Sequence, residues 1–214
     1  LEIDPEFALA YFHLAGHLER TNELTESKMH YQKASDVDQN YVEAYFNLAR
    51  ILTTPAEYDQ AVRNYETAIE IDPAHAKSHY WLAKILAGGE RLTADGTLVK
   101  EPKLDIAEQH FRRAIDIDPK YAKAHFRLGL LLSELRHYAD AFKHYSEALR
   151  INPSYSEAHY RMAVLLMDPD ASKDLLPKKP KTSSSRKPTV SAKKGTSSSK
   201  PKSKGKSRSV PKKK

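Results

Sequence analysis

Residues 107–119 read AEQHFRRAIDIDP, and residues 141–153 read AFKHYSEALRINP. In both stretches an alanine, an aromatic residue, a second alanine and a proline stand at the same offsets, and the stretches start 34 residues apart. Residues 61–73, AVRNYETAIEIDP, carry the same four residues. A repeat of this period predicts a helical solenoid, in which similar units stack one on the next.

The small residues indicate that each unit is a hairpin of two helices. Upstream of each copy, apolar residues recur at helical spacing, as in Leu128, Leu131, Leu132 and Leu135. The residues expected where the two helices touch are Ala15, Ala49, Ala83, Gly129 and Ala163 in the first helix, and Ser27, Ala61, Ala107 and Ala141 in the second. The proline then ends the second helix, because it has no N–H group to donate.

These residues resemble the tetratricopeptide repeat family, whose motif has an aromatic residue, Leu-Gly, Tyr, Ala, an aromatic residue, Ala and Pro in this order. The resemblance covers residues 1 to about 167 and implies an all-α, right-handed solenoid of helical hairpins. We place the end of a preceding repeat at 1–7, repeats at 8–41, 42–75, 76–121 and 122–155, an unpaired or capping helix at 156–176, and a tail at 177–214. Because residues 1–5 copy the end of a repeat, we expect a further repeat upstream.

The third repeat is 12 residues longer than the others, and the extra residues fall in an inserted loop at 88–103, between its two helices. Residues 92–99 are expected to form a short β-hairpin around Asp95-Gly96, a pair that tolerates positive φ. The insertion is either a secondary contact surface or a neutral variation in length.

The first helix of the fifth unit, expected at 156–167, has no obvious second helix to pair with. Residues 167–170, Met-Asp-Pro-Asp, break the pattern, and Leu175-Leu176 is too short a remnant for a second helix. A solenoid normally ends in a helix with a polar outer face. We therefore expect residues 168–176 to fold over Leu165 and Leu166, or that surface to meet another molecule.

Charge divides the chain into two parts. Residues 177–214 hold 15 of the 35 Lys and Arg residues and none of the 28 Asp and Glu residues. The repeats are therefore acidic and the tail is strongly basic, although the whole chain has a formal net charge of +7. With Val190 and Val210 as its sizeable apolar residues, the tail cannot bury enough surface to become ordered and is expected to be disordered.

The basic tail resembles a nuclear-import signal and the tail of a linker histone. Its candidate residues are Lys178, Lys179, Lys181, Arg186, Lys187, Lys193 and Lys194. Such a segment binds nucleic acid or another polyanion by counterion release, without reading a sequence. It is otherwise a plain import signal or a solubilising tail. The chain has no cysteine, so we expect an intracellular protein, and the tail favours the nucleus over the cytoplasm.

The sequence offers no catalytic constellation and predicts no enzyme, no cofactor and no metal site. His13 and His17 are four residues apart, but they lack the Glu of an HExxH motif and a third ligand. His79, His125 and His159 share one repeat position on helices that lie about 8–10 Å apart, which is too far to share one ion. We interpret these three as packing side chains with satisfied polar tips.

The resemblance implies that a partner binds along the first helices, which line the concave groove of a tetratricopeptide solenoid. The candidate groove residues are Phe12, Phe46, Asn47, Arg50, Lys77, Tyr80, Trp81, Lys84, Lys123, Phe126, Arg127 and Tyr160. Aromatic rings beside Lys and Arg suit an extended protein or peptide segment, in particular an acidic one. The alternative is that the ring at the fifth position of each first helix packs only against the neighbouring first helix.

Some members of the family hold the carboxylate-ending tails of chaperones in a two-carboxylate clamp. Lys123 and Arg127 match two clamp positions, but Trp81 stands where that clamp has an asparagine. Phe46 and Arg50 replace the lysine and the asparagine of its first helix. A chaperone tail is therefore not the expected partner.

Three functions are compatible with this sequence. The first is a non-enzymatic interaction scaffold or adaptor, with a tail for nuclear targeting or polyanion contact. The second is a nucleic-acid or chromatin-associated protein whose tail is the main binding element, and the third is the repeat portion of a larger enzyme. No apolar stretch reaches the roughly 18 residues that span a membrane, and the residues do not specify an oligomeric state.

Overall fold

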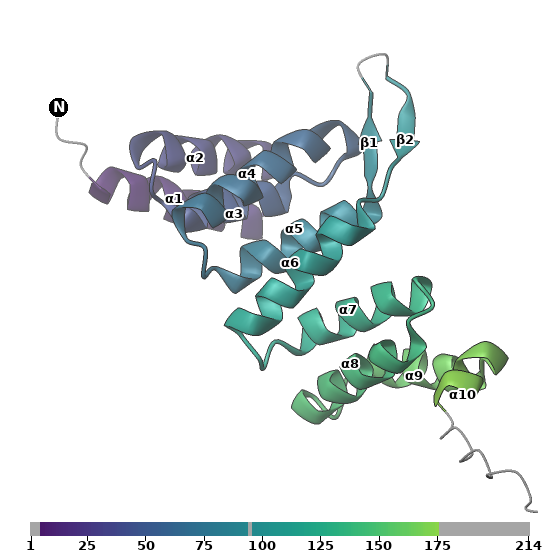
Figure 1. The fold of residues 1–214 in the computed structure, drawn as a ribbon. Helices are drawn as coiled ribbons and strands as arrows, with labels where there is room; N and C mark the ends of the chain where they lie inside the picture. Colours follow the sequence, from purple (N-terminus) through teal and green to yellow (C-terminus); the bar gives the residue numbers. More distant parts are fainter. Residues whose placement is uncertain (1–4, 94–95, 176–214) are drawn as a thin grey trace, which may run out of the picture. The chain divides into compact units, whose positions relative to one another are not determined.

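The computed structural model describes residues 5–93 and 96–175, and over this part the helices form an all-α solenoid (Figure 1). The first and second helices of the successive pairs are α1 (Pro5–Arg20) and α2 (Leu24–Val37), α3 (Val42–Ile51) and α4 (Tyr58–Ile71), α5 (Ala76–Gly88) and α6 (Leu104–Ile117), α7 (Ala122–Glu134) and α8 (Tyr138–Ile151), then α9 (Ser156–Met167). Each second helix packs against its own first helix and against the next one. The solenoid predicted from the repeat is therefore confirmed.

The sequence predicted a disordered tail and no membrane-spanning segment. The predicted disordered tail, with all its candidate basic residues, lies outside the described residues. Within the described part of the chain, no helix is long and apolar enough to cross a membrane.

Small residues allow the paired helices to lie close together, as the sequence predicts. The second-helix residues Ala61, Ala107 and Ala141 are completely buried. In the first pair Ser27 takes their place, and its hydroxyl donates a 2.8 Å hydrogen bond to the carbonyl oxygen of Ala15. At Gly129 a Cβ atom would lie 2.9 Å from ring carbons of Tyr145, so the helices of the fourth repeat leave no room for a side chain there.

A polar side chain stabilises the turn that follows each second helix. Helices α4, α6 and α8 end directly before Asp-Pro or Asn-Pro, and Asp72 Oδ1 accepts the N–H of Ala74 at 2.9 Å. Helix α2 ends in the same way although Gln39 replaces the proline, because Asp38 Oδ1 accepts the N–H of Asn40 at 2.9 Å. The turn therefore depends on the Asp or Asn as well as on the proline.

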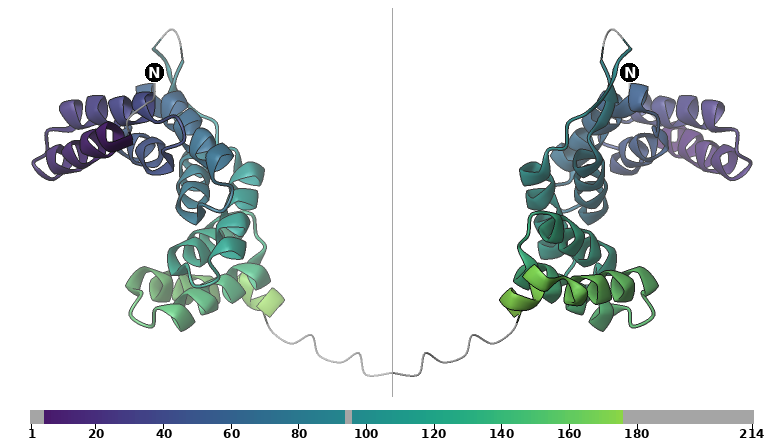
Figure 2. Two further views of the ribbon diagram at one scale, coloured as in Figure 1. Left: turned by 90° about the vertical axis from the view of Figure 1, so that its left-hand side faces the viewer. Right: turned by 90° about the vertical axis from the view of Figure 1, so that its right-hand side faces the viewer.

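The inserted loop forms the β-hairpin that the sequence predicts. Strand β1 (Glu90–Leu92) pairs antiparallel with β2 (Leu98–Lys100), and Gly96 has a φ of 82°. Strand β1 contacts α4 and a 3₁₀ helix, η1 (Pro55–Glu57). The hairpin therefore leans on the preceding helical pair, and its strands project beyond the helices (Figure 2).

The end of the helical stack corrects one expectation. Leu175-Leu176 was expected to be too short a remnant for a second helix, yet residues 169–175 form α10 (Pro169–Leu175). Asp168 starts this helix, because its Oδ1 accepts the N–H of Asp170 at 2.8 Å. Helix α10 packs against α8 and α9. Leu165 is buried, whereas Leu166 remains 51% exposed. Helix α10 therefore covers α9 only in part.

Candidate partner-binding groove

Three of the candidate groove rings are buried in the solenoid. Phe46, Tyr80 and Phe126 are only 8%, 6% and 4% exposed, and Phe12 is half-buried. These rings therefore offer little surface to a partner, and the structure favours the packing interpretation for them.

Each buried ring is covered by a second ring from the residue just before the next first helix. The ring centroids are 5.1 Å apart for Phe12 and Tyr41, 5.2 Å for Phe46 and His75, 4.9 Å for Tyr80 and Tyr121, and 4.9 Å for Phe126 and Tyr155. The sequence analysis missed these covering rings. The signal was available, because they recur two residues after each Asp-Pro, Asn-Pro or Asp-Gln pair.

Tyr160 differs from the other four rings. It is 64% exposed, because no following first helix in the described part of the chain places a ring over it. The guanidinium carbon of Arg161 lies 5.9 Å from its centroid. Tyr160 is therefore the fifth-position ring that remains available for contact.

Three candidate cations come together on α5 and α7, and we call Lys84, Lys123 and Arg127 the cation centre. The Lys84 ammonium lies 4.2 Å from the ring centroid of Trp81, a cation–π contact that holds it in place. Burial lowers the pKa of Lys84, and the charges of Arg127 and Lys123 lower it further. No carboxylate of the described residues forms an ion pair with these three side chains.

Arg50, by contrast, is already paired inside the molecule. Its Nη2 donates to both carboxylate oxygens of Glu19, at 2.7 and 2.6 Å, and its Nε donates to Asn47 Oδ1 at 3.3 Å. Asn47 in turn donates to the carbonyl oxygen of Glu43. The structure therefore does not bring Arg50 and Asn47 into the cation centre. Lys77 is exposed near the start of α5.

Three hollows follow one another along the first helices. The first, of about 430 Å³, lies between α3 and α5; the second, of about 300 Å³, between α5 and α7; the third, of about 500 Å³, between α7 and α9. Lys84 lines the first two hollows, and Arg127 lines the last two. An extended segment lying along the first helices would therefore pass both cations in turn.

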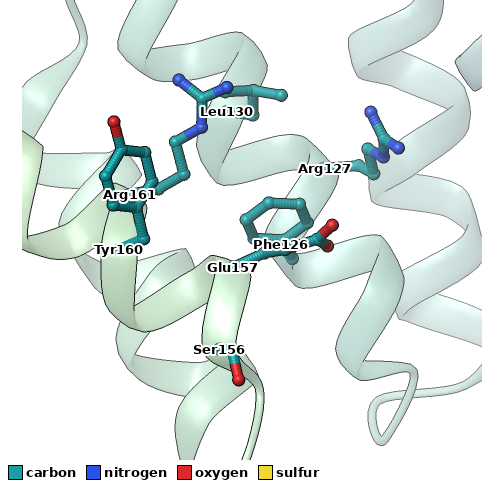
Figure 3. A pocket seen from close by; sticks show the side chains of 7 residues that line it. All are labelled: Phe126, Arg127, Leu130, Ser156, Glu157, Tyr160 and Arg161. Carbon is teal, nitrogen blue, oxygen red and sulfur yellow. The ribbon is translucent and has the colours of Figure 1, made fainter.

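The third hollow has side chains of both signs. Figure 3 shows Arg127 on α7, and Glu157, Tyr160 and Arg161 on α9. The Leu130 side chain and the Phe126 ring form its apolar lining. This mixture can hold a polar segment with occasional apolar side chains.

Of the three repeated histidines, His79 and His125 pack between paired helices as predicted, whereas His159 is exposed and the packing prediction is wrong for it. Nε2 of His79 and of His125 each lies 3.3 Å from a proline carbonyl oxygen, and that of His159 lies 2.9 Å from one. Nδ1 of His79 contacts His110, and Nδ1 of His125 contacts His144. The described residues contain no group of three or more His, Cys, Asp or Glu side chains that could hold a metal ion.

Two segments of the chain match known family models. The tetratricopeptide repeat family matches residues 122–155, and a second family described as TPR repeat matches residues 57–88. The first match spans α7 and α8, and the second spans α4 and α5. These two segments of the chain therefore match tetratricopeptide repeats. No curated protein sequence matches the chain.

Several solved structures share the fold at low sequence identity. The MamA protein is 18% identical with a TM-score of 0.62, over 74% of this chain and 80% of its own. PilF of Pseudomonas aeruginosa is 21% identical with a TM-score of 0.63, over 75% and 68%. YrrB, described as a TPR protein with an unusual peptide-binding site, is 20% identical with a TM-score of 0.60, over 78% and 81%.

Proposed function

We propose that this chain, built from tetratricopeptide repeats, is a non-enzymatic interaction scaffold that binds an acidic segment of a partner protein along its first helices. The observation that carries the proposal is the cation centre. Residues 1–176 hold more acidic than basic residues, yet Lys84, Lys123 and Arg127 converge without an ion-pair partner among the described residues. A carboxylate placed among them would relieve their mutual repulsion.

The groove geometry supports a segment rather than a compact ligand. The three hollows lie in succession along α3, α5, α7 and α9, and neighbouring hollows share Lys84 or Arg127. An extended chain is the ligand shape that fits a row of shallow, open sites. The fold that this chain shares with YrrB, whose description names a peptide-binding site, is consistent with the proposal.

Selection from a display library of random nine-residue peptides tests the proposal. Wild-type protein is expected to enrich peptides rich in Asp and Glu, and the variant Lys123→Glu/Arg127→Glu to lose this enrichment. The matched control is Arg63→Glu/Arg113→Glu, which reverses two exposed charges on second helices. Equal enrichment by wild type and the groove variant, or no enrichment by wild type, would overturn the proposal.

We further propose that the basic tail directs the protein to the nucleus or contacts a polyanion. The support is its composition, with 15 cations and no carboxylate in residues 177–214. Binding to duplex DNA, titrated with salt and compared with and without these residues, separates the two roles. An affinity that falls steeply with salt, and a steep slope that is lost when the tail is removed, would indicate polyanion contact. A slope near zero with the tail present would leave nuclear import as the role of the tail.

A further inference from the structure

The insertion of the third repeat contributes one wall of the hollow between α3 and α5, which we call the insertion pocket. The hairpin side is formed by Gly88, Gly89 and Glu90, where the chain leaves α5 and enters β1. The opposite side comes from the end of α3 and the following residues, including Leu52. Gly89 and Glu90 begin the 12-residue insertion, which the other repeats of this chain lack.

The wall is held in a defined place. Gly89 has a φ of 65° and ends α5 in the left-handed conformation, with its N–H bonded to the Ile85 carbonyl oxygen at 3.0 Å. The carbonyl oxygen of Gly89 accepts the N–H of Glu101 at 2.9 Å, and the N–H of Lys103 donates to the carbonyl oxygen of Leu86 at 3.0 Å. These hydrogen bonds therefore hold the two ends of the insertion together beside the pocket.

The insertion pocket has an apolar floor, two cations, Arg50 and Lys84, and one carboxylate, Glu90, which pairs with Lys100 at 3.6 Å. Leu52 and Tyr58 are 5% exposed, and Ile85 and Trp81 are half-buried beside them. Of its two cations, Arg50 is neutralised by Glu19, which leaves Lys84 above the Trp81 ring. The volume of about 430 Å³ lies within the range of sites that hold small ligands or a few side chains.

We propose that the insertion pocket receives one large apolar side chain of the partner segment, adjacent to an acidic residue that Lys84 holds. This inference rests on the proposed function, since the same acidic segment passes Lys84 on its way along the first helices. The apolar floor and the Trp81 face favour an aromatic or large aliphatic anchor, because burying such a side chain removes the most apolar surface from water.

Gly88 provides a direct way to close the pocket. A Cβ atom at this helical residue would meet nothing within 4 Å, and its φ lies outside the left-handed region. Gly88 lines both the insertion pocket and the second hollow, so Gly88→Phe is expected to place a ring where the two meet, without disturbing the backbone. Gly88→Ala is the matched control, since it adds a single methyl group and leaves the pocket open.

The experiment is the same peptide-library selection, read out at the apolar positions. Wild type and Gly88→Ala should enrich acidic peptides with one Phe, Trp, Leu or Ile next to Asp or Glu, and Gly88→Phe should keep the acidic enrichment but lose the apolar one. For an enriched peptide without tryptophan, Gly88→Phe should weaken binding at least tenfold. Trp81, the only tryptophan of the chain, should change its fluorescence when such a peptide binds the wild type.

The possible outcomes separate the two proposals. Acidic enrichment without an apolar preference, or an apolar preference that survives Gly88→Phe, would overturn the insertion pocket and leave the scaffold function standing. No enrichment at all would overturn the scaffold function and the pocket with it. Circular dichroism of both Gly88 variants verifies that each is folded before the selections are compared.

Discussion

The Nδ1 atoms of His79 and His110 lie 2.9 Å apart, so one imidazole donates a hydrogen bond to the other across the third repeat. Nε2 of His79 lies 3.3 Å from the carbonyl oxygen of Pro73, which can only accept. His79 therefore carries its proton on Nε2, and His110 donates from Nδ1. His125 and His144 repeat the arrangement at 3.2 Å. If both rings of a pair carried a proton on Nδ1, neither could accept the hydrogen bond of the other.

We expect the free energy of unfolding to fall as the pH drops from about 7 to about 4. Burial lowers the pKa of His79, His110 and His144, that of His144 to about 4, whereas an unfolded histidine titrates near 6.5. The unfolded chain therefore binds protons first, and acid favours unfolding. The loss by about pH 5, measured by urea denaturation, should be on the order of 1 kcal/mol for each pair.

The variant His110→Asn/His144→Asn should make this pH dependence shallower. Asn64 occupies the equivalent position in the second repeat, so the substitution is one that the fold already accommodates. His159→Asn serves as the control, because no second histidine of the described residues faces that ring. A double variant with the wild-type slope between about pH 7 and 5 would contradict the assignment.

Gly89→Ala should destabilise the protein by about 2–4 kcal/mol. A Cβ atom at Gly89 would lie 2.4 Å from the backbone nitrogen of Pro102, and its φ of 65° disfavours any other residue. Gly88→Ala is the control and should be neutral or stabilising by about 0.5–1 kcal/mol, because alanine suits a helix better than glycine. Urea denaturation measures both, and equal midpoints for the two variants would refute the close packing of Gly89 against Pro102.

Glu19→Gln should cost about 1 kcal/mol of stability by removing the half-buried ion pair with Arg50. Burial and the neighbouring Glu19 carboxylate raise the pKa of Tyr31 to about 12. The substitution should therefore also lower the Tyr31 pKa, which NMR titration of the tyrosine ring can follow. Glu26→Gln, at an exposed position of α2, should change neither quantity, and an unchanged Tyr31 pKa in Glu19→Gln would count against the contact.

Asp168→Ala should unfold α10 and cost about 0.5–2 kcal/mol. The reason is that Asp168 Oδ1 accepts the first free N–H groups of the helix, from Asp170 at 2.8 Å and from Ala171 at 3.3 Å. Hydrogen exchange of the amides of residues 172–175 is the measurement, with the exposed Asp174→Ala as the control. Unchanged protection in Asp168→Ala would show that packing against α8 and α9 holds the helix without its cap.

The sequence alone predicted the solenoid and the β-hairpin, because both depend on neighbours along the chain. The alanines at 61, 107 and 141 mark contacts within one repeat, and Asp95-Gly96 suits a local turn. It was wrong about α10, where the cap at Asp168 and the packing of a short helix outweigh its low intrinsic helical stability. It left open whether the fifth-position rings are contact surface or packing, and the rings that cover Tyr80 and Phe126 favour packing there, whereas Tyr160 stays exposed.

What the sequence determined by itself is the periodic part of this protein, namely which segments are helices, where they end and where the insertion falls. Only the tertiary structure decided which side chains remain available. Arg50 and Lys84 read alike in the sequence, yet Arg50 meets Glu19 on another helix whereas Lys84 meets Arg127 and Lys123. The physical reason is that helical periodicity is a local property, while pairing of charges depends on distances between helices that no local pattern specifies.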